Sequence, residues 1–289
     1  MHRSTLSRLV LAAATTLGAI AGVVAFTVSS STAVPTSTAS LNIQLAHGGP
    51  KVVKKPTVVL VHGAFADSSS WNDVIARLQR DGYPVLAASN PLRDLASDAA
   101  YVRSVLDSVG GPIVLAGHSY GGTVLSSAAA GHPNVKALVY LAALAPDRGE
   151  STAELLSMFP GNTLGQNLKA VPYPLPGGGT GTDLYVDPAA FHKHFAADVP
   201  AKVARLMAAT QRPAATAALE TKATVAAWRT IPSWALIATE DRAIPLATQR
   251  FMARRAGSHT VEVKASHAVT VSQPDRVAKL ITQAARAVS

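Results

Sequence analysis

Short apolar runs alternate with amphipathic stretches along the chain from residue 56 onward. Strands are predicted where β-branched and apolar residues cluster, at residues 57–61, 84–87, 113–115, 137–141, 234–237 and 260–263. Helices are predicted where apolar residues recur at helical spacing, at residues 71–80, 99–109, 123–130, 245–256 and 274–288. This alternation predicts an α/β fold, in which a doubly wound, mostly parallel sheet has helices on both faces.

The alternation is interrupted between about residues 147 and 228. This insertion contains stretches of helical character at residues 188–197, 202–209 and 213–227, and a Pro/Gly-rich segment at residues 171–182. An insertion between two strands of such a sheet lies at one end of the sheet, so we interpret it as a helical cap over a pocket. Its Gly-rich run follows no predicted strand and lacks the Gly-Lys-Ser/Thr ending of a phosphate loop, which predicts a mobile cap loop.

The N-terminal residues have the pattern of an export signal. Arg3 and Arg8 precede an uncharged, mostly apolar segment at residues 9–28, and Ser31-Thr-Ala33 supplies small residues for cleavage. We therefore expect residues 1–33 to be a signal for the general secretory route, because the two arginines are not adjacent. The apolar segment is about 20 residues long, so an uncleaved membrane anchor is the alternative.

Composition predicts a linker and excludes several classes of partner and chemistry. Residues 34–55 are rich in Ser, Thr, Gly and Pro and are typical of a linker, so we expect the folded domain at residues 56–289. The net charge of +9 is spread along the chain without a basic stripe, which argues against a nucleic-acid partner. There is no cysteine, so disulfides, thiolate nucleophiles and cysteine metal ligands are excluded.

One motif carries candidate chemistry. Gly117-His-Ser119-Tyr-Gly121 fits the pattern G-x-S-x-G, directly after a predicted strand and directly before a predicted helix. In that context the serine lies on a strained strand-to-helix turn, which exposes its hydroxyl above the helix N-terminus. Ser119 is therefore the candidate nucleophile.

A serine nucleophile needs a base and an acid that orients the base. His267 follows the last predicted strand, and Asp241 follows the strand before it, so both lie at carboxyl ends of strands, where open α/β sheets bind ligands. Asp241 is the preferred acid. Glu240 beside it and Asp147, after an earlier strand, are the alternatives.

Four segments together resemble the α/β-hydrolase superfamily from residue 56 to the C-terminus. They are Val61-His-Gly-Ala64, Gly117-His-Ser-Tyr-Gly-Gly122, Glu240-Asp-Arg-Ala-Ile-Pro245 and Ser266-His267, in this order. The chain is most similar to the branch that contains plant methylesterases, hydroxynitrile lyases and bacterial esterase-like hydrolases. The resemblance implies an oxyanion hole made by the backbone N–H groups of Ala64 and Tyr120.

We therefore expect an exported serine hydrolase that acts on small, largely apolar carboxylic esters. The resemblance implies the ester hydrolysis, residues 1–33 predict the export, and the composition of the cap indicates a largely apolar pocket. We expect no cofactor and no metal, a small-molecule substrate as partner, and a monomer by default. Lyase activity is disfavoured, because Gly63 stands where such lyases have threonine and Ala268 where they have lysine. Lactones, thioesters or amides as substrates, perhydrolysis or acyl transfer, and ligand binding without catalysis remain alternatives.

Overall fold

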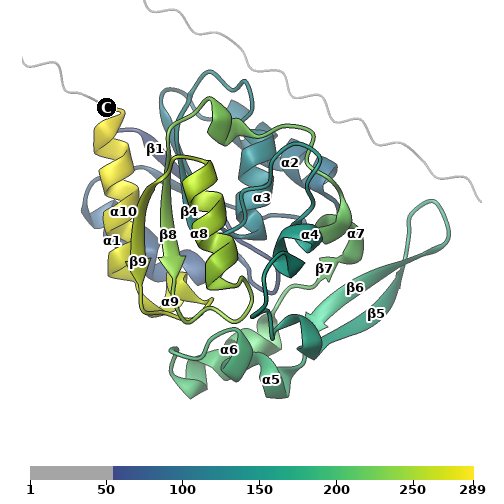
Figure 1. Cartoon of the computed structure of the whole chain (residues 1–289). Helices are drawn as coiled ribbons and strands as arrows, with labels where there is room; N and C mark the ends of the chain where they lie inside the picture. The colour runs from purple at the N-terminus through teal and green to yellow at the C-terminus, as the bar shows by residue number, and fades with distance from the viewer. Residues whose placement is uncertain (1–54) are drawn as a thin grey trace, which may run out of the picture. The chain divides into compact units, whose positions relative to one another are not determined.

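The computed structural model describes residues 55–289, and their central element is a six-stranded sheet (Figure 1). Its strands, in spatial order, are β2 (Val85–Ala88), β1 (Thr57–Val61), β3 (Ile113–Ser119), β4 (Val135–Ala143), β8 (Ser233–Ala238) and β9 (His259–Val263). Every neighbouring pair is parallel, as the alternating pattern predicts. The expected signal at residues 1–33 and residues 34–54 of the expected linker lie outside the described residues.

Helices cover both faces of the sheet (Figure 1). On one face lie α1 (Asn72–Arg80), α9 (Val269–Ser272) and α10 (Pro274–Ala287), and on the other α2 (Leu95–Asp107), α3 (Tyr120–Ala128) and α8 (Leu246–Arg255). Helix α2 begins four residues before the predicted start at residue 99. The reason is Asp94, whose side chain accepts the Ser97 N–H at 2.9 Å and caps the helix there.

The insertion contains more extended structure than the sequence pattern predicts. Its elements are α4 (Thr152–Ser157), η2 (Gly165–Asn167), β5 (Leu168–Pro174), β6 (Thr180–Val186), α5 (Pro188–His194), α6 (Ala201–Thr210), β7 (Ala214–Ala215), α7 (Thr216–Glu220) and η3 (Ala227–Arg229). The predicted helix at residues 213–227 is therefore reduced to the short α7. Strands β5, β6 and β7 form a separate antiparallel sheet in that order.

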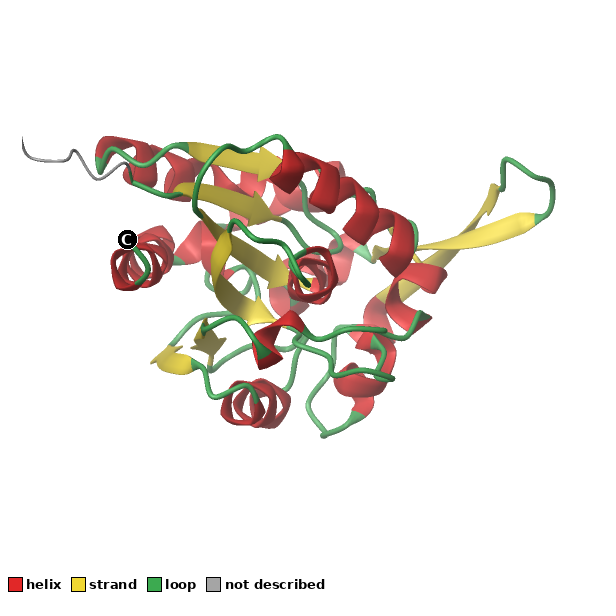
Figure 2. Ribbon diagram, turned by 90° about the horizontal axis from the view of Figure 1, so that it is seen from above, coloured by secondary structure: helices red, strands yellow, loops and turns green. Residues whose placement is uncertain are grey.

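The Pro/Gly-rich segment belongs to a β-hairpin. The prediction of a loop is confirmed for residues 177–179, which form the turn, and is wrong for residues 180–182, which begin β6. Gly178 and Gly179 have φ of +90° and +85°, the left-handed conformation that a tight turn between β5 and β6 requires. Pro172 and Pro174 are tolerated because β5 is an edge strand, where a missing N–H donor costs no ladder hydrogen bond. The hairpin extends away from the sheet (Figure 2).

The carboxyl ends of the parallel strands face the insertion (Figure 1). Ser119 ends β3, and the loops that follow β1, β8 and β9 open on the same edge of the sheet. The fold therefore brings sequence segments that are far apart to one place. Within residues 55–289, every helix is too short or too polar to cross a membrane.

Two histidines are enclosed in the core at this edge. His62 follows β1 and is 0% exposed, and His118 lies in β3 and is 1% exposed. Burial lowers the pKa of His62 from its ordinary 6.5 to about 4. Burial, together with the neighbouring His267 ring, lowers the pKa of His118 to about 3.

We expect these histidines to make the fold sensitive to acid. The unfolded chain protonates both near pH 6.5, whereas the folded chain keeps them neutral down to about pH 4 and about pH 3. Their contribution to stability is present above pH 6.5 and is lost as the pH falls, by up to about 1.4 kcal/mol per pH unit for each histidine. His62→Gln should reduce this slope in urea unfolding between pH 6.5 and 4.5, and His259→Gln, at an exposed position in β9, should not. Equal slopes for wild type and His62→Gln would contradict the prediction.

Candidate active site

Ser119 occupies a strained turn between β3 and α3. Its backbone has φ of +54° and ψ of −126°, a region that residues other than glycine rarely adopt. The turn is held by close packing, because a Cβ atom at Gly121 would overlap the carbonyl oxygen of Val61 in β1. Ser119 is 7% exposed, and its hydroxyl is directed to the edge of the sheet where the other predicted site residues lie.

The three residues predicted to form a catalytic triad are joined by hydrogen bonds. The Ser119 hydroxyl lies 2.9 Å from Nε2 of His267, and Nδ1 of His267 lies 2.8 Å from Oδ2 of Asp241. An Nδ1–H that donates to the carboxylate leaves Nε2 free to accept the serine proton. Such an arrangement increases the nucleophilicity of a serine hydroxyl.

Asp241 is fixed by donors other than His267. Its Oδ1 accepts the N–H groups of Ala243 at 2.7 Å and Ile244 at 3.0 Å, and its Oδ2 accepts Nε2 of Gln249 at 3.0 Å. The side chain is 0% exposed. These donors hold the carboxylate in one orientation and stabilise its negative charge.

The two alternative acids lie elsewhere. Glu240 is directed toward Lys264, with 3.6 Å between its Oε1 and the ammonium nitrogen. Asp147 forms an ion pair with Arg229, whose Nε lies 2.9 Å from Oδ1. The structure therefore brings Asp241, and neither alternative, to His267.

The residues predicted to supply the oxyanion donors, Ala64 and Tyr120, line the same cavity as Ser119. A Cβ atom placed on Gly63 would lie 2.6 Å from Cβ and 3.2 Å from Oγ of Ser119, so only glycine allows this loop to approach. Ala64 follows directly, and its N–H donates to no other backbone group among residues 55–289. Tyr120 is the first residue of α3, where helix N–H groups lack partners within the helix.

Two further residues support the site, and sequence reasoning missed the first of them, Asp98. The Tyr120 hydroxyl donates to Oδ2 of Asp98 at 2.8 Å, and the carboxylate also accepts the Arg93 N–H at 3.0 Å. Burial raises the pKa of Asp98 above its ordinary value. Asp98 lies four residues before Val102 on the buried stripe of α2, and a carboxylate in an apolar stripe is a signal that could have found it.

His118 is the second supporting residue. Its Nε2 donates to the carbonyl oxygen of His267 at 2.8 Å, and the two rings lie 4.7 Å apart. The histidine beside the nucleophile is directed away from Ser119 and holds the backbone of His267. The sequence places His118 next to the nucleophile but gives no indication of this partner.

A cavity of about 50 Å³ adjoins Ser119 and His267, and we call it the catalytic cavity. Its wall on the insertion side is largely apolar and includes Leu156, Leu164, Leu168 and Leu219. Ala64 and Tyr120 line the opposite side. The insertion therefore covers a pocket, and that pocket contains the reactive groups.

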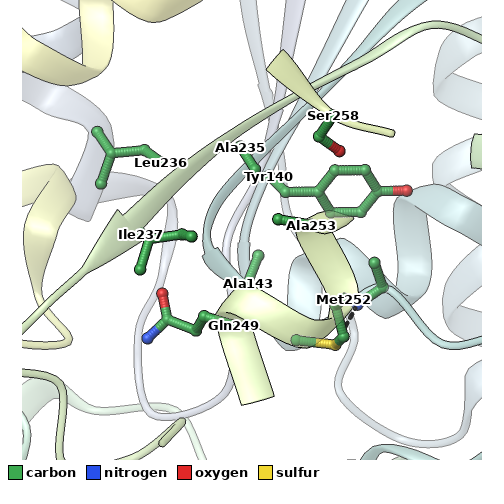
Figure 3. A pocket seen from close by; sticks show the side chains of 10 residues that line it. Tyr140, Ala143, Ala235, Leu236, Ile237, Gln249, Met252, Ala253 and Ser258 are labelled. Atoms are coloured by element: carbon green, nitrogen blue, oxygen red, sulfur yellow. Dashed lines mark hydrogen bonds between the residues drawn. The ribbon is translucent and has the colours of Figure 1, made fainter. Parts of the chain in front are cut away.

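A second cavity, between β4, β8 and α8, contains none of the predicted site residues (Figure 3). Its volume is about 10 Å³, room for one water molecule at most. Gln249 lies at one end of it and donates to Asp241. This cavity belongs to the packing of α8 on the sheet.

Metal-binding geometry is not found among residues 55–289. His192 and His194 of α5 have separate partners, because Nε2 of His192 lies 2.9 Å from the Val199 carbonyl and Nδ1 of His194 lies 2.9 Å from the Thr163 hydroxyl.

Several known proteins are similar to this chain in sequence or in fold. The chain is 28% identical to alpha/beta hydrolase nvfD of Aspergillus novofumigatus, over 80% of this chain and 97% of that protein. It is 27% identical to the Arabidopsis thaliana chloroplast protein with the provisional name methylesterase 11, over 79% of this chain and 63% of that protein. A pyrethroid hydrolase from Sphingobium faniae JZ-2 has the same fold, with a TM-score of 0.66, 24% identity, and coverage of 80% of this chain and 98% of that one.

The sequence model of the alpha/beta hydrolase family matches residues 58–280, a range that includes all but the first residue of β1, the Ser119 turn, Asp241 and His267. The chain belongs to the alpha/beta hydrolase family.

Proposed function

We propose that this protein hydrolyses carboxylic esters through an acyl-enzyme on Ser119. The observation that carries the proposal is the continuous hydrogen-bonded chain from Ser119 to His267, at 2.9 Å, and on to Asp241, at 2.8 Å. The family and the hydrolase and esterase names of similar proteins agree with this reaction class.

In the first half-reaction, the Ser119 hydroxyl attacks the ester carbonyl while Nε2 of His267 takes its proton. The carbonyl oxygen becomes an oxyanion, which accepts hydrogen bonds from the N–H groups of Ala64 and Tyr120. Fixed donors of this kind are each worth about 3 kcal/mol in the transition state. Asp241 stabilises the imidazolium that forms.

His267 then donates the proton to the leaving alkoxide, and the acyl group stays on Ser119. Water, deprotonated by His267, attacks the acyl-enzyme in the second half-reaction, and the free acid is released. The apolar wall and small volume of the catalytic cavity favour small, largely apolar esters.

The proposal includes a location outside the cytoplasm. It rests on the sequence of residues 1–33, where two arginines precede an apolar segment and a small-residue cleavage site.

Replacing the nucleophile gives the primary test. Ser119→Ala should reduce kcat/KM for p-nitrophenyl acetate by about 10⁴-fold or more, because no covalent intermediate can form. The matched control is Ser127→Ala in the same helix, whose hydroxyl is buried without a hydrogen-bond partner among residues 55–289. Turnover that survives in Ser119→Ala, or falls equally in both variants, would overturn the assignment.

Replacing the acid tests the orientation of His267. In Asp241→Asn the amide cannot accept all four hydrogen bonds that the carboxylate accepts, so His267 loses its required tautomer. We expect kcat/KM to fall by about 10³- to 10⁴-fold. Glu240→Gln and Asp147→Asn should remain near wild type, and an equal loss in either of them would favour that residue as the acid.

Export is tested by expressing the full chain in a bacterium with a general secretory pathway. The mass of the protein recovered outside the cytoplasm should correspond to cleavage near Ala33. Full-length protein that stays in the membrane fraction would favour the uncleaved anchor.

A further inference from the structure

A second pocket lies beside the catalytic cavity and shares one wall with it. This outer pocket is bounded by the loop of residues 65–70 on one side, by Val203, Leu206 and Met207 of α6 on the other, and by Val271 of α9. Its volume is about 210 Å³, four times that of the catalytic cavity at about 50 Å³. Phe65 lines both.

The volumes limit what the catalytic cavity can hold. An apolar cavity of about 150 Å³ accepts a benzene ring. At about 50 Å³ the catalytic cavity is smaller than that, which favours the reacting carbonyl group and a short acyl chain as its occupants. The remainder of a larger ester then needs a further site beside this cavity.

The outer pocket begins one residue from the oxyanion loop. Ala64 provides the proposed oxyanion donor, and Phe65 follows it, 7% exposed and with a φ of +62°. The Phe65 N–H donates to the Arg212 carbonyl at 3.0 Å, which ties this loop to the segment that follows α6. Phe65 lines both pockets, so the two pockets adjoin at this residue.

The reaction decides which part of the ester lies there. His267 must hand its proton to the leaving oxygen, so the leaving group is on the His267 side of the carbonyl. Val271 of α9, in the segment that follows His267, lines the outer pocket. An alcohol that leaves on this side, with the proton of His267 on its oxygen, would enter the outer pocket while the acyl group stays bonded to Ser119.

The walls of the outer pocket define the chemical class of that alcohol. Leu206 and Val203 expose 62% and 37% of their surface, an unusual amount for large apolar side chains, and both face the pocket. The opposite wall carries the carboxylate of Asp67, held by the Ser69 N–H at 2.7 Å. The wall of Val203 and Leu206 favours the binding of apolar groups, and the wall with the Asp67 carboxylate repels anions.

We propose that the outer pocket is the leaving-group site, and that the substrates are short-chain acyl esters of bulky, apolar, uncharged alcohols or phenols. The proposal rests on the proposed ester hydrolysis and adds the substrate class. Phe65 separates a small acyl group from a large leaving group.

Filling the outer pocket tests its role. Val203→Trp should lower the ratio of kcat/KM for 2-naphthyl acetate to kcat/KM for ethyl acetate at least tenfold, because the indole ring takes the place of the leaving group. Val261→Trp is the matched control, since Val261 of β9 is 37% exposed, as Val203 is, and lines neither pocket. Methyl 2-naphthoate, with the bulky group on the acyl side, should be a poor substrate for the wild type.

The charge of the pocket is tested with Asp67→Asn, which keeps a residue able to cap the following turn. For each enzyme, kcat/KM for the acetate of a sulfonated 2-naphthol is divided by kcat/KM for 2-naphthyl acetate. This ratio should be about tenfold higher in Asp67→Asn than in the wild type. Ratios unchanged in both Val203→Trp and Asp67→Asn, or methyl 2-naphthoate preferred over 2-naphthyl acetate, would overturn the leaving-group site and leave ester hydrolysis standing. If no ester is hydrolysed in a Ser119-dependent way, the proposed function itself fails.

Discussion

The left-handed turn at Ser119 is the constraint on which the rest of the site depends. A non-glycine residue in such a conformation costs about 1–3 kcal/mol and persists only where its surroundings hold it. Here β3 is buried along its whole length, and the first turn of α3 packs against the end of β1 too closely for any side chain at Gly121. The packing of two strands and one helix therefore offsets the strain and fixes the hydroxyl at the sheet edge.

Parallel strands then bring the partners of Ser119 to the same edge. His267 is 148 residues away in sequence, yet its loop follows β9 as the Ser119 turn follows β3. The Asp241 loop follows β8, between them in the sheet order. Every strand of this sheet runs in one direction, so the loops after β3, β8 and β9 lie at the same edge. The strand pattern alone therefore predicts that these three loops come together, although they share no local sequence feature.

This geometry explains how much the sequence could predict. The strand and helix pattern was sufficient to predict the fold. The order of serine, acid and histidine along the chain was sufficient to predict which side chains meet, because the parallel sheet brings them to one edge. Sequence reasoning preferred Asp241 but left Glu240 open, because the two residues are adjacent. In the structure, the N–H groups of Ala243 and Ile244 and the side chain of Gln249 hold the carboxylate of Asp241 in place.

The hairpin and Asp98 show where local reasoning fails. Pro and Gly in residues 171–182 hide the usual alternating pattern of a strand. The segment is nevertheless extended, because β6 pairs with β5 on one side and with β7 on the other. Asp98 gains its role from Tyr120, which reaches it from another helix. The pairing of β6 with β7 and the contact of Tyr120 with Asp98 both join segments that are far apart in sequence, so a short window of sequence contains neither interaction.

Three consecutive residues after β1 combine the separate tasks of the site. Gly63 allows the close approach to Ser119, Ala64 is the proposed donor to the oxyanion, and Phe65 lines both the catalytic cavity and the outer pocket. Under the proposed mechanism, a substitution in this loop alters transition-state stabilisation and pocket shape together, because one backbone segment carries both. Helix α6 contributes side chains to the outer pocket alone, so changes on its exposed face can alter the pocket without moving the oxyanion donor. In this architecture selectivity can change along α6 while the chemistry at Ser119 is kept.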